Sequence, residues 1–382
     1  MRIIPLTIGA LLHFAVKAQA QSIEILNKIC SLQTVEDDFY DPGLFPVQRS
    51  WSASKEAVED NTIFFSASIA YTLDQIRDKM DLESKRIASQ IVDRITPNYR
   101  NYQSRNDKPT FNFWQTVAPD LPFPNGSKLI SNDKMRLPDD LDTSVIIALS
   151  STEDSVKTLL RKKMVAYAGR AGRDQNRINT LAKFQSSEAY EVWFAKEMPQ
   201  TFDICVLSNV LLFVFSEGFA LEKYDQASIF LIKEILKQRD YLDRTDAVSH
   251  HTTSAAVILY HVARMVAADK RGIFDDLRPL LIADLASTAA KATDEVEKML
   301  AYTSLLRLGI RPAKELDHKK LKSDLGDFVF FSVKPFLGNP QFAFLNSVVP
   351  NISWYCEAYN WTLYLEFLHF NHPDFSNLST SR

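Results

Sequence analysis

The chain has 382 residues, of which 46% are hydrophobic and 24% charged, enough for one large domain or two ordinary ones. The formal net charge of -3 gives no sign of the basic surface that nucleic-acid binding requires. Ten glycines are too few for Gly-rich nucleotide-binding loops or for a turn-dense all-β fold.

The N-terminus has the pattern of a secretory signal peptide. A basic start at Arg2 precedes the mostly apolar stretch 3–16, and the small residues Ala18 and Ala20 follow. We expect cleavage after Ala20, export to the periplasm or the extracellular space, and a mature single domain of residues 21–382. A buried N-terminal helix is the alternative. No later segment has the length and hydropathy of a transmembrane helix.

The cysteines indicate neither a disulfide framework nor a metal site. Cys30, Cys205 and Cys356 are an odd, widely spaced set without a C-x-x-C motif, and no Cys/His cluster accompanies them. We expect no structural metal and no cofactor. The sequence does not show whether any two of the three are paired.

Helical periodicity dominates from residue 64 onward. Alternating strands are scarce, and the best candidate is 329–333. The sequence therefore predicts an all-α fold. The expected helices, in chain order, are 64–76, 82–95, 143–150, 153–168, 203–216, 224–237, 249–268, 275–290, 294–308 and 355–369.

An acidic helix start is the most informative local pattern. Pro138 is followed by Asp139, Asp140 and Asp142, and then by the apolar run 145–149. Unpaired N–H groups and the helix dipole favour negative charge in a first helical turn. This pattern predicts a capped helix that begins close to Asp140.

Polar starts recur on several of the expected helices. Asp142, Asp203 and the pair His250 and His251 each precede small and apolar residues, and more amphipathic helices alternate with these. Each helix with a polar start, together with the amphipathic helix that follows it, would form a helical hairpin. Such hairpins, arranged in a closed or nearly closed ring, would form an α/α toroid. The polar starts would then meet at the mouth of a central cavity.

Four segments carry a resemblance to a known superfamily. They are 111–114 (FNFW), 138–144 (PDDLDTS), 202–212 (FDICVLSNVLL) and 354–366 (WYCEAYNWTLYLE). They resemble landmarks of uncharacterised bacterial proteins of the terpenoid cyclase and protein prenyltransferase superfamily, which are squalene cyclase-like α/α toroids. The resemblance implies this toroid over roughly residues 60–370 and does not by itself imply an activity.

The expected function is ligand binding in the central cavity. We expect an exported toroid that takes a small apolar, isoprenoid-like or mixed-polarity ligand, with no assigned reaction. The expected site residues are Asp140 and Asp142 as candidate catalytic groups, and Asp203, Asn209, His250, His251, Glu357 and Trp354 as ligand-binding groups.

Two enzymatic alternatives remain open. Proton-initiated terpene cyclases carry a D-x-D-D-T motif, but Leu141 stands here at the position of its acid, so Asp140 would have to replace it. A secreted glycan hydrolase or lyase on an α/α barrel would instead need two opposed carboxylates, or a His/Tyr pair with a neutralising cation.

Overall fold

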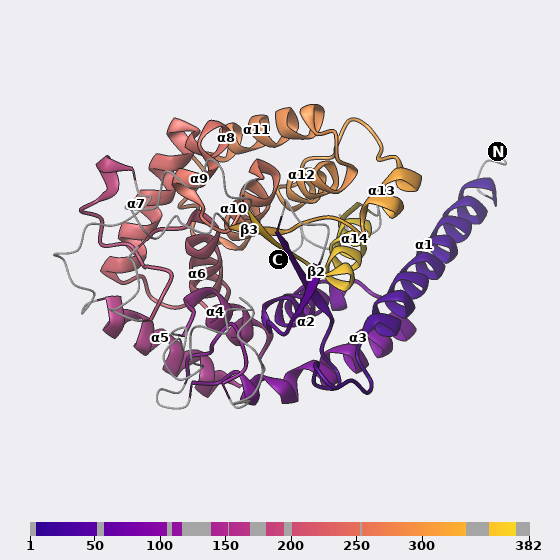
Figure 1. The fold of residues 1–382 in the computed structure, drawn as a ribbon. Coiled ribbons are helices and arrows are strands. Elements are labelled where there is room, and N and C mark those ends of the chain that lie inside the picture. Colours follow the sequence, from indigo (N-terminus) through magenta and orange to yellow (C-terminus); the bar gives the residue numbers. More distant parts are fainter. Residues whose placement is uncertain are drawn as a thin grey trace.

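The computed structural model shows a mostly helical protein with one small antiparallel sheet, which confirms the predicted all-α class (Figure 1). The structure describes residues 5–51, 57–104, 109–116, 139–151, 153–168, 181–194, 201–252, 254–333 and 351–371. Pro138 lies outside these ranges, as do most of residues 98–134.

Six helices are buried over most of their length and pack against one another in series. They are α2 (Phe64–Arg77), α4 (Leu141–Ser150), α6 (Ile204–Ser216), α10 (Ala255–Ala268), α12 (Glu295–Arg307) and α14 (Glu357–Asn371). Each contacts the next in chain order, and α14 contacts α2, so the series returns to its start. Most of their residues are small or apolar, which suits these helices to burial between neighbours.

A second set of helices covers the first. These are α3 (Leu82–Ile95), α5 (Asp154–Ala168), α7 (Lys223–Gln238), α8 (Asp240–Asp243), α9 (Thr245–Val248), α11 (Arg278–Lys291) and α13 (His318–Asp324). Figure 1 shows α5, α7, α11 and α13 on the outside of the molecule. Among these, α3, α5, α7 and α11 each contact the buried helix that precedes or follows them in the chain.

The sheet joins segments that are far apart in the sequence. Its strands β1 (Val47–Trp51), β2 (Ala57–Asp60), β3 (Phe331–Val333) and β4 (Ile352–Tyr355) pair in the order β2-β1-β4-β3. Trp354 is the register partner of both Arg49 and Phe331. Its indole Nε1 also donates over 2.9 Å to the carboxylate of Asp60, the last residue of β2, and so links β4 to β2 across β1.

The first helix, α1 (Pro5–Leu32), runs without a break through the predicted cleavage site. At this site Ala20 is exposed, whereas Ser22 and Ile25, further along the helix, are buried. The helix contacts α3 and α14, and Figure 1 shows its N-terminal part extending away from the rest of the molecule. None of the helices in the described ranges is long and apolar enough to cross a membrane.

Three predicted helices begin at least two residues later than expected. The predicted helix 249–268 begins at Ala255, because residues 249–251 bond to Asp203 instead of entering the helix. The predicted helix 275–290 begins at Arg278, and that at 355–369 begins at Glu357. Trp354, the first residue of the segment 354–366, lies on β4.

Candidate functional site

The acidic start of α4 is held in place by two neighbouring segments. The Asp140 side chain accepts hydrogen bonds from the backbone N–H groups of Asp142 (3.0 Å) and Thr143 (3.2 Å), as a helix N-cap does. The Thr143 hydroxyl donates to the same carboxylate over 2.5 Å. Backbone bonds from Asp140 to Phe111 and from Leu141 to Val192 fix the entry of the chain into the helix. The predicted cap is therefore present, with Asp140 as the capping residue.

Asp142 lies within the first turn and is buried beside this cap. Its carboxylate accepts a 2.8 Å hydrogen bond from the Asn209 amide on α6. Burial raises the pKa of Asp142 to about 7, with the negative charge of Asp140 as the next contribution. Burial also raises the pKa of Asp140. Because the two carboxyl groups interact, they titrate as a pair that retains a proton near neutral pH.

Asp203 joins the starts of α6 and α10. One carboxylate oxygen caps α6 through Cys205 N (2.8 Å). The other oxygen accepts from the Ser249 hydroxyl (2.9 Å), the His250 backbone N–H (2.7 Å) and His251 Nδ1 (3.0 Å). This carboxylate therefore anchors the segment that leads into α10.

The pKa values in this group follow from burial and pairing. Burial alone would raise the pKa of Asp203, but the hydrogen bond and charge of His251 outweigh it and hold that pKa well below its usual range. Burial opposes charge on His251 as well, yet the bond to Asp203 gives a net rise in the pKa of His251. His250, whose Nε2 contacts the Thr201 hydroxyl, has a pKa lowered by burial to about 4.

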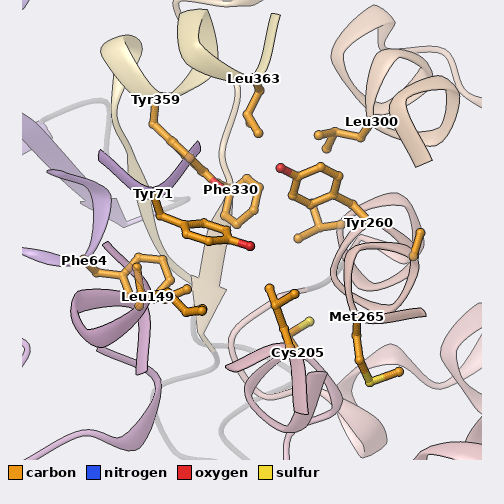
Figure 2. Packing of buried hydrophobic residues seen from close by; sticks show 14 of the residues in the cluster. Phe64, Tyr71, Leu149, Cys205, Tyr260, Met265, Leu300, Phe330, Tyr359 and Leu363 are labelled. Atoms are coloured by element: carbon orange, nitrogen blue, oxygen red, sulfur yellow. The ribbon is translucent and has the colours of Figure 1, made fainter. Parts of the chain in front are cut away.

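Asn209 connects the acidic group to the interior of the molecule. Its side-chain oxygen accepts from Arg264 Nη2 (2.8 Å) and lies 3.1 Å from His261 Nδ1, both on α10. The Arg264 guanidinium lies 5.2 Å from the ring centroids of Tyr71 and Tyr260. Figure 2 shows these two tyrosines, from α2 and α10, pointing into the same central region. Burial, followed by the charge of Arg264, lowers the pKa of His261 to about 3, so this imidazole is neutral.

A second buried polar group lies on the other side of Tyr260. The Tyr260 hydroxyl donates to Glu366 on α14 over 2.7 Å, and Arg307 on α12 donates to the same carboxylate through Nε over 2.9 Å. Glu366 is fully buried. Together with the apolar side chains shown in Figure 2, such as Phe330, these groups fill the interior between α2, α10, α12 and α14.

The structure brings together six of the predicted site residues and places two elsewhere. Hydrogen bonds connect Asp142 to Asn209, and Asp203 to both histidines, while Asp140 caps the helix that carries Asp142. Glu357 instead forms a 2.9 Å ion pair with Lys28 near the surface. Trp354 bonds to Asp60, as described above.

The polar residues of the interior were not predicted from the sequence. Arg264 and His261 lie within the apolar run 256–266, and Arg307 and Glu366 are each flanked by apolar residues. A cation within an otherwise apolar helix is a signal for a buried polar network, because burying an unpaired charge is unfavourable. That signal identifies the residue but not its partners, which lie on other helices.

The described residues provide little open space next to the acidic group. A pocket of about 10 Å³, enough for about one water molecule, lies between α4, α5 and residues 189–194, and Leu141 is part of its lining. No group of three His, Cys, Asp or Glu residues in the described ranges is arranged to hold a metal ion. All three cysteines are free thiols.

Comparisons with known proteins give no relative for this chain. No family model, no curated protein and no solved structure matches it.

Proposed function

We propose that this chain is an α/α toroid, similar in architecture to the terpenoid cyclases, that binds a small apolar or isoprenoid-like ligand. The closed series of contacts from α2 to α14 supports the toroid, because each buried helix has two buried neighbours. One observation carries the binding function: Asn209 links the carboxyl group of Asp142 to Arg264 and thereby to the aromatic interior. Sites for apolar ligands are lined mostly by aromatic and apolar side chains with a few polar groups, and this interior holds the same combination of residues.

Mass spectrometry of molecules that co-purify with the protein from the host envelope tests this function. We expect an isoprenoid or another largely apolar compound in a stoichiometric amount. Bound sugar would favour the glycan-active alternative, and protein that carries only water would contradict the proposal. The exposed fractions of the carboxylates, 7% for Asp140 and Asp142 and 1% for Asp203, give the glycan alternative no support, since it needs an open groove.

The raised pKa of Asp142 favours a second candidate, an acid-initiated isoprenoid cyclase. A carboxylic acid that protonates an alkene must first keep its proton, and burial raises the pKa of Asp142, which titrates together with Asp140, to about 7. Asp140 is less suited than Asp142, because three donors bond to it as the helix cap. Incubation with squalene should give cyclic products, and Asp142→Asn should reduce their rate by about 10²–10⁴-fold. Equal rates in Asp142→Asn and wild type would contradict this candidate.

We also propose that residues 1–20 are a signal peptide and that the mature protein is exported. The contact of Gln21 supports this proposal: its amide donates over 2.9 Å to the Tyr364 hydroxyl, so a chain that begins at Gln21 keeps this bond to α14. N-terminal sequencing of protein from the native host should begin at Gln21. An intact Met1 would contradict export by this route.

A further inference from the structure

Two cationic side chains share one aromatic ring near the ends of α2, α12 and α14. The Lys79 amine lies 3.6 Å from the centroid of the Phe370 ring, and the Arg307 guanidinium lies 4.5 Å from the same centroid. Lys79 comes two positions after the end of α2, Arg307 ends α12, and Phe370 is on the last turn of α14. The two positive charges therefore lie within about one Debye length of each other, about 8 Å at physiological salt, and repel.

Of these two cations, only Lys79 can lose its charge. Arg307 donates to the buried carboxylate of Glu366 through Nε over 2.9 Å and also through Nη2, whereas Lys79 forms no ion pair with the described residues. A guanidinium stays protonated in proteins, but a lysine amine loses its proton more easily when it is desolvated or lies near another cation. Burial, followed by the charge of Arg307, lowers the pKa of Lys79 to about 8, and the charge of Glu366 opposes this shift. The Phe370 ring attracts a cation and so holds the lysine beside Arg307.

An uncharged amine at this position is a nucleophile that a small reagent can reach. At about pH 7.5 a pKa of about 8 leaves roughly a quarter of the amine uncharged, against about a thousandth for an ordinary lysine. Lys79 is partly exposed, so a small electrophile needs no cavity in order to meet it. The charge of Arg307 indicates which product fits, because an adduct with a negative charge replaces repulsion by attraction.

We propose that the Lys79 amine takes up carbon dioxide and forms a carbamate. The lone pair of the uncharged nitrogen forms a bond to the carbon of carbon dioxide. One electron pair of a C=O bond moves to its oxygen, and the nitrogen releases one proton to water. The carbamate carries one negative charge and has Arg307 as its counter-ion across the Phe370 ring. This modification does not depend on the proposed ligand binding.

Chemical trapping of the carbamate on the full-length protein tests this proposal. The protein is incubated with isotopically labelled bicarbonate near pH 7.5, triethyloxonium ion converts carbamates to stable ethyl esters, and mass spectrometry of peptides locates the label. We expect at least about tenfold more label at Lys79 than at Lys237, an exposed lysine paired with Glu234. The N-terminal α-amino group, whose ordinary pKa is also about 8, is the internal positive control. Label at the terminus, with no more at Lys79 than at Lys237, would overturn the proposal.

Variants locate the label and test the contribution of Arg307. Lys79→Arg keeps the positive charge and should lose the label, whereas Lys237→Arg should leave the label at Lys79 unchanged. Arg307→Met removes the neighbouring cation and should lower the label at Lys79 about tenfold. Thermal unfolding checks that the variants are folded. Undiminished label at Lys79 in folded Arg307→Met would contradict the selection of an anionic product by Arg307. If Arg307→Met does not fold, the comparison of Lys79 with Lys237 in the wild type decides the question.

Discussion

Replacing Asp203 with alanine is expected to lower the free energy of unfolding by about 3 kcal/mol, because a buried carboxylate that accepts several hydrogen bonds is lost and its donors stay buried. The Asp203 carboxylate is 1% exposed, caps α6 and anchors the segment that leads into α10. The substitution leaves several buried donors without an acceptor. Urea denaturation monitored by circular dichroism measures the loss.

Asp81→Ala is the matched control for this variant. Asp81 caps α3 through the backbone N–H groups of Glu83 and Ser84, but it lies at the surface and has no histidine partner. Loss of such a cap should reduce stability by about 1 kcal/mol. If both alanine variants lose the same amount, Asp203 is only a helix cap and the bonds to residues 249–251 add nothing.

The pH dependence of the Asp203 contribution separates charge from hydrogen bonding. Because the folded pKa of Asp203 lies below 3.8, its stabilising effect is complete above pH 3.8 and declines as the pH falls through the folded value. The folded pKa of His251 lies above 6.5, so its effect is complete below pH 6.5 and declines as the pH rises through the folded value. The stability difference between wild type and Asp203→Asn should therefore be largest between pH 3.8 and 6.5.

Asparagine is a suitable replacement in this pH series because it also caps helices well. The comparison therefore removes the charge and keeps the cap. The His251 side chain is 28% exposed, so solvent screening reduces the amplitude of the effect. A stability difference that stays constant from pH 4 to pH 9 would show that the charge of His251 does not contribute.

The helices could be predicted from the sequence because their signals are local. Asp140 and Asp203 precede apolar runs, and both are N-caps in the structure. The helical spacing of apolar residues likewise predicted the helix 82–95 correctly. Such patterns depend on neighbours within one or two turns, which the sequence shows directly.

The sheet and the interior network depend on contacts that are distant in the sequence. Strand β1 pairs with β4, some 300 positions away, and each strand is too short for a clear alternating pattern. The partner of Glu366 could not be read from its surroundings either, because Arg307 lies on another helix. Asp142 and Asn209 were both named as site residues, but only the structure shows that they are bonded.

Glu366→Gln is expected to lower the free energy of unfolding by about 3–5 kcal/mol, because it leaves the charge of Arg307 buried without a counter-charge. Glu366 is fully buried and bonds to both Arg307 and Tyr260, so it joins α14 to α12 and α10. Thermal and urea denaturation measure the change. These three helices are consecutive in the closed series of contacts, so the variant tests a bond between neighbouring members of that series.

Glu357→Gln is the matched control, because it makes the same substitution on the same helix. Glu357 pairs with Lys28 where both side chains are more than a third exposed, and such pairs contribute about 0–1 kcal/mol. The double variant Glu366→Gln/Arg307→Met should regain part of the loss, since it removes the uncompensated cation as well. If the double variant is no more stable than Glu366→Gln, the loss arises from the bond to Tyr260 and from packing. In that case the ion pair would not be what holds α12 and α14 together around the interior.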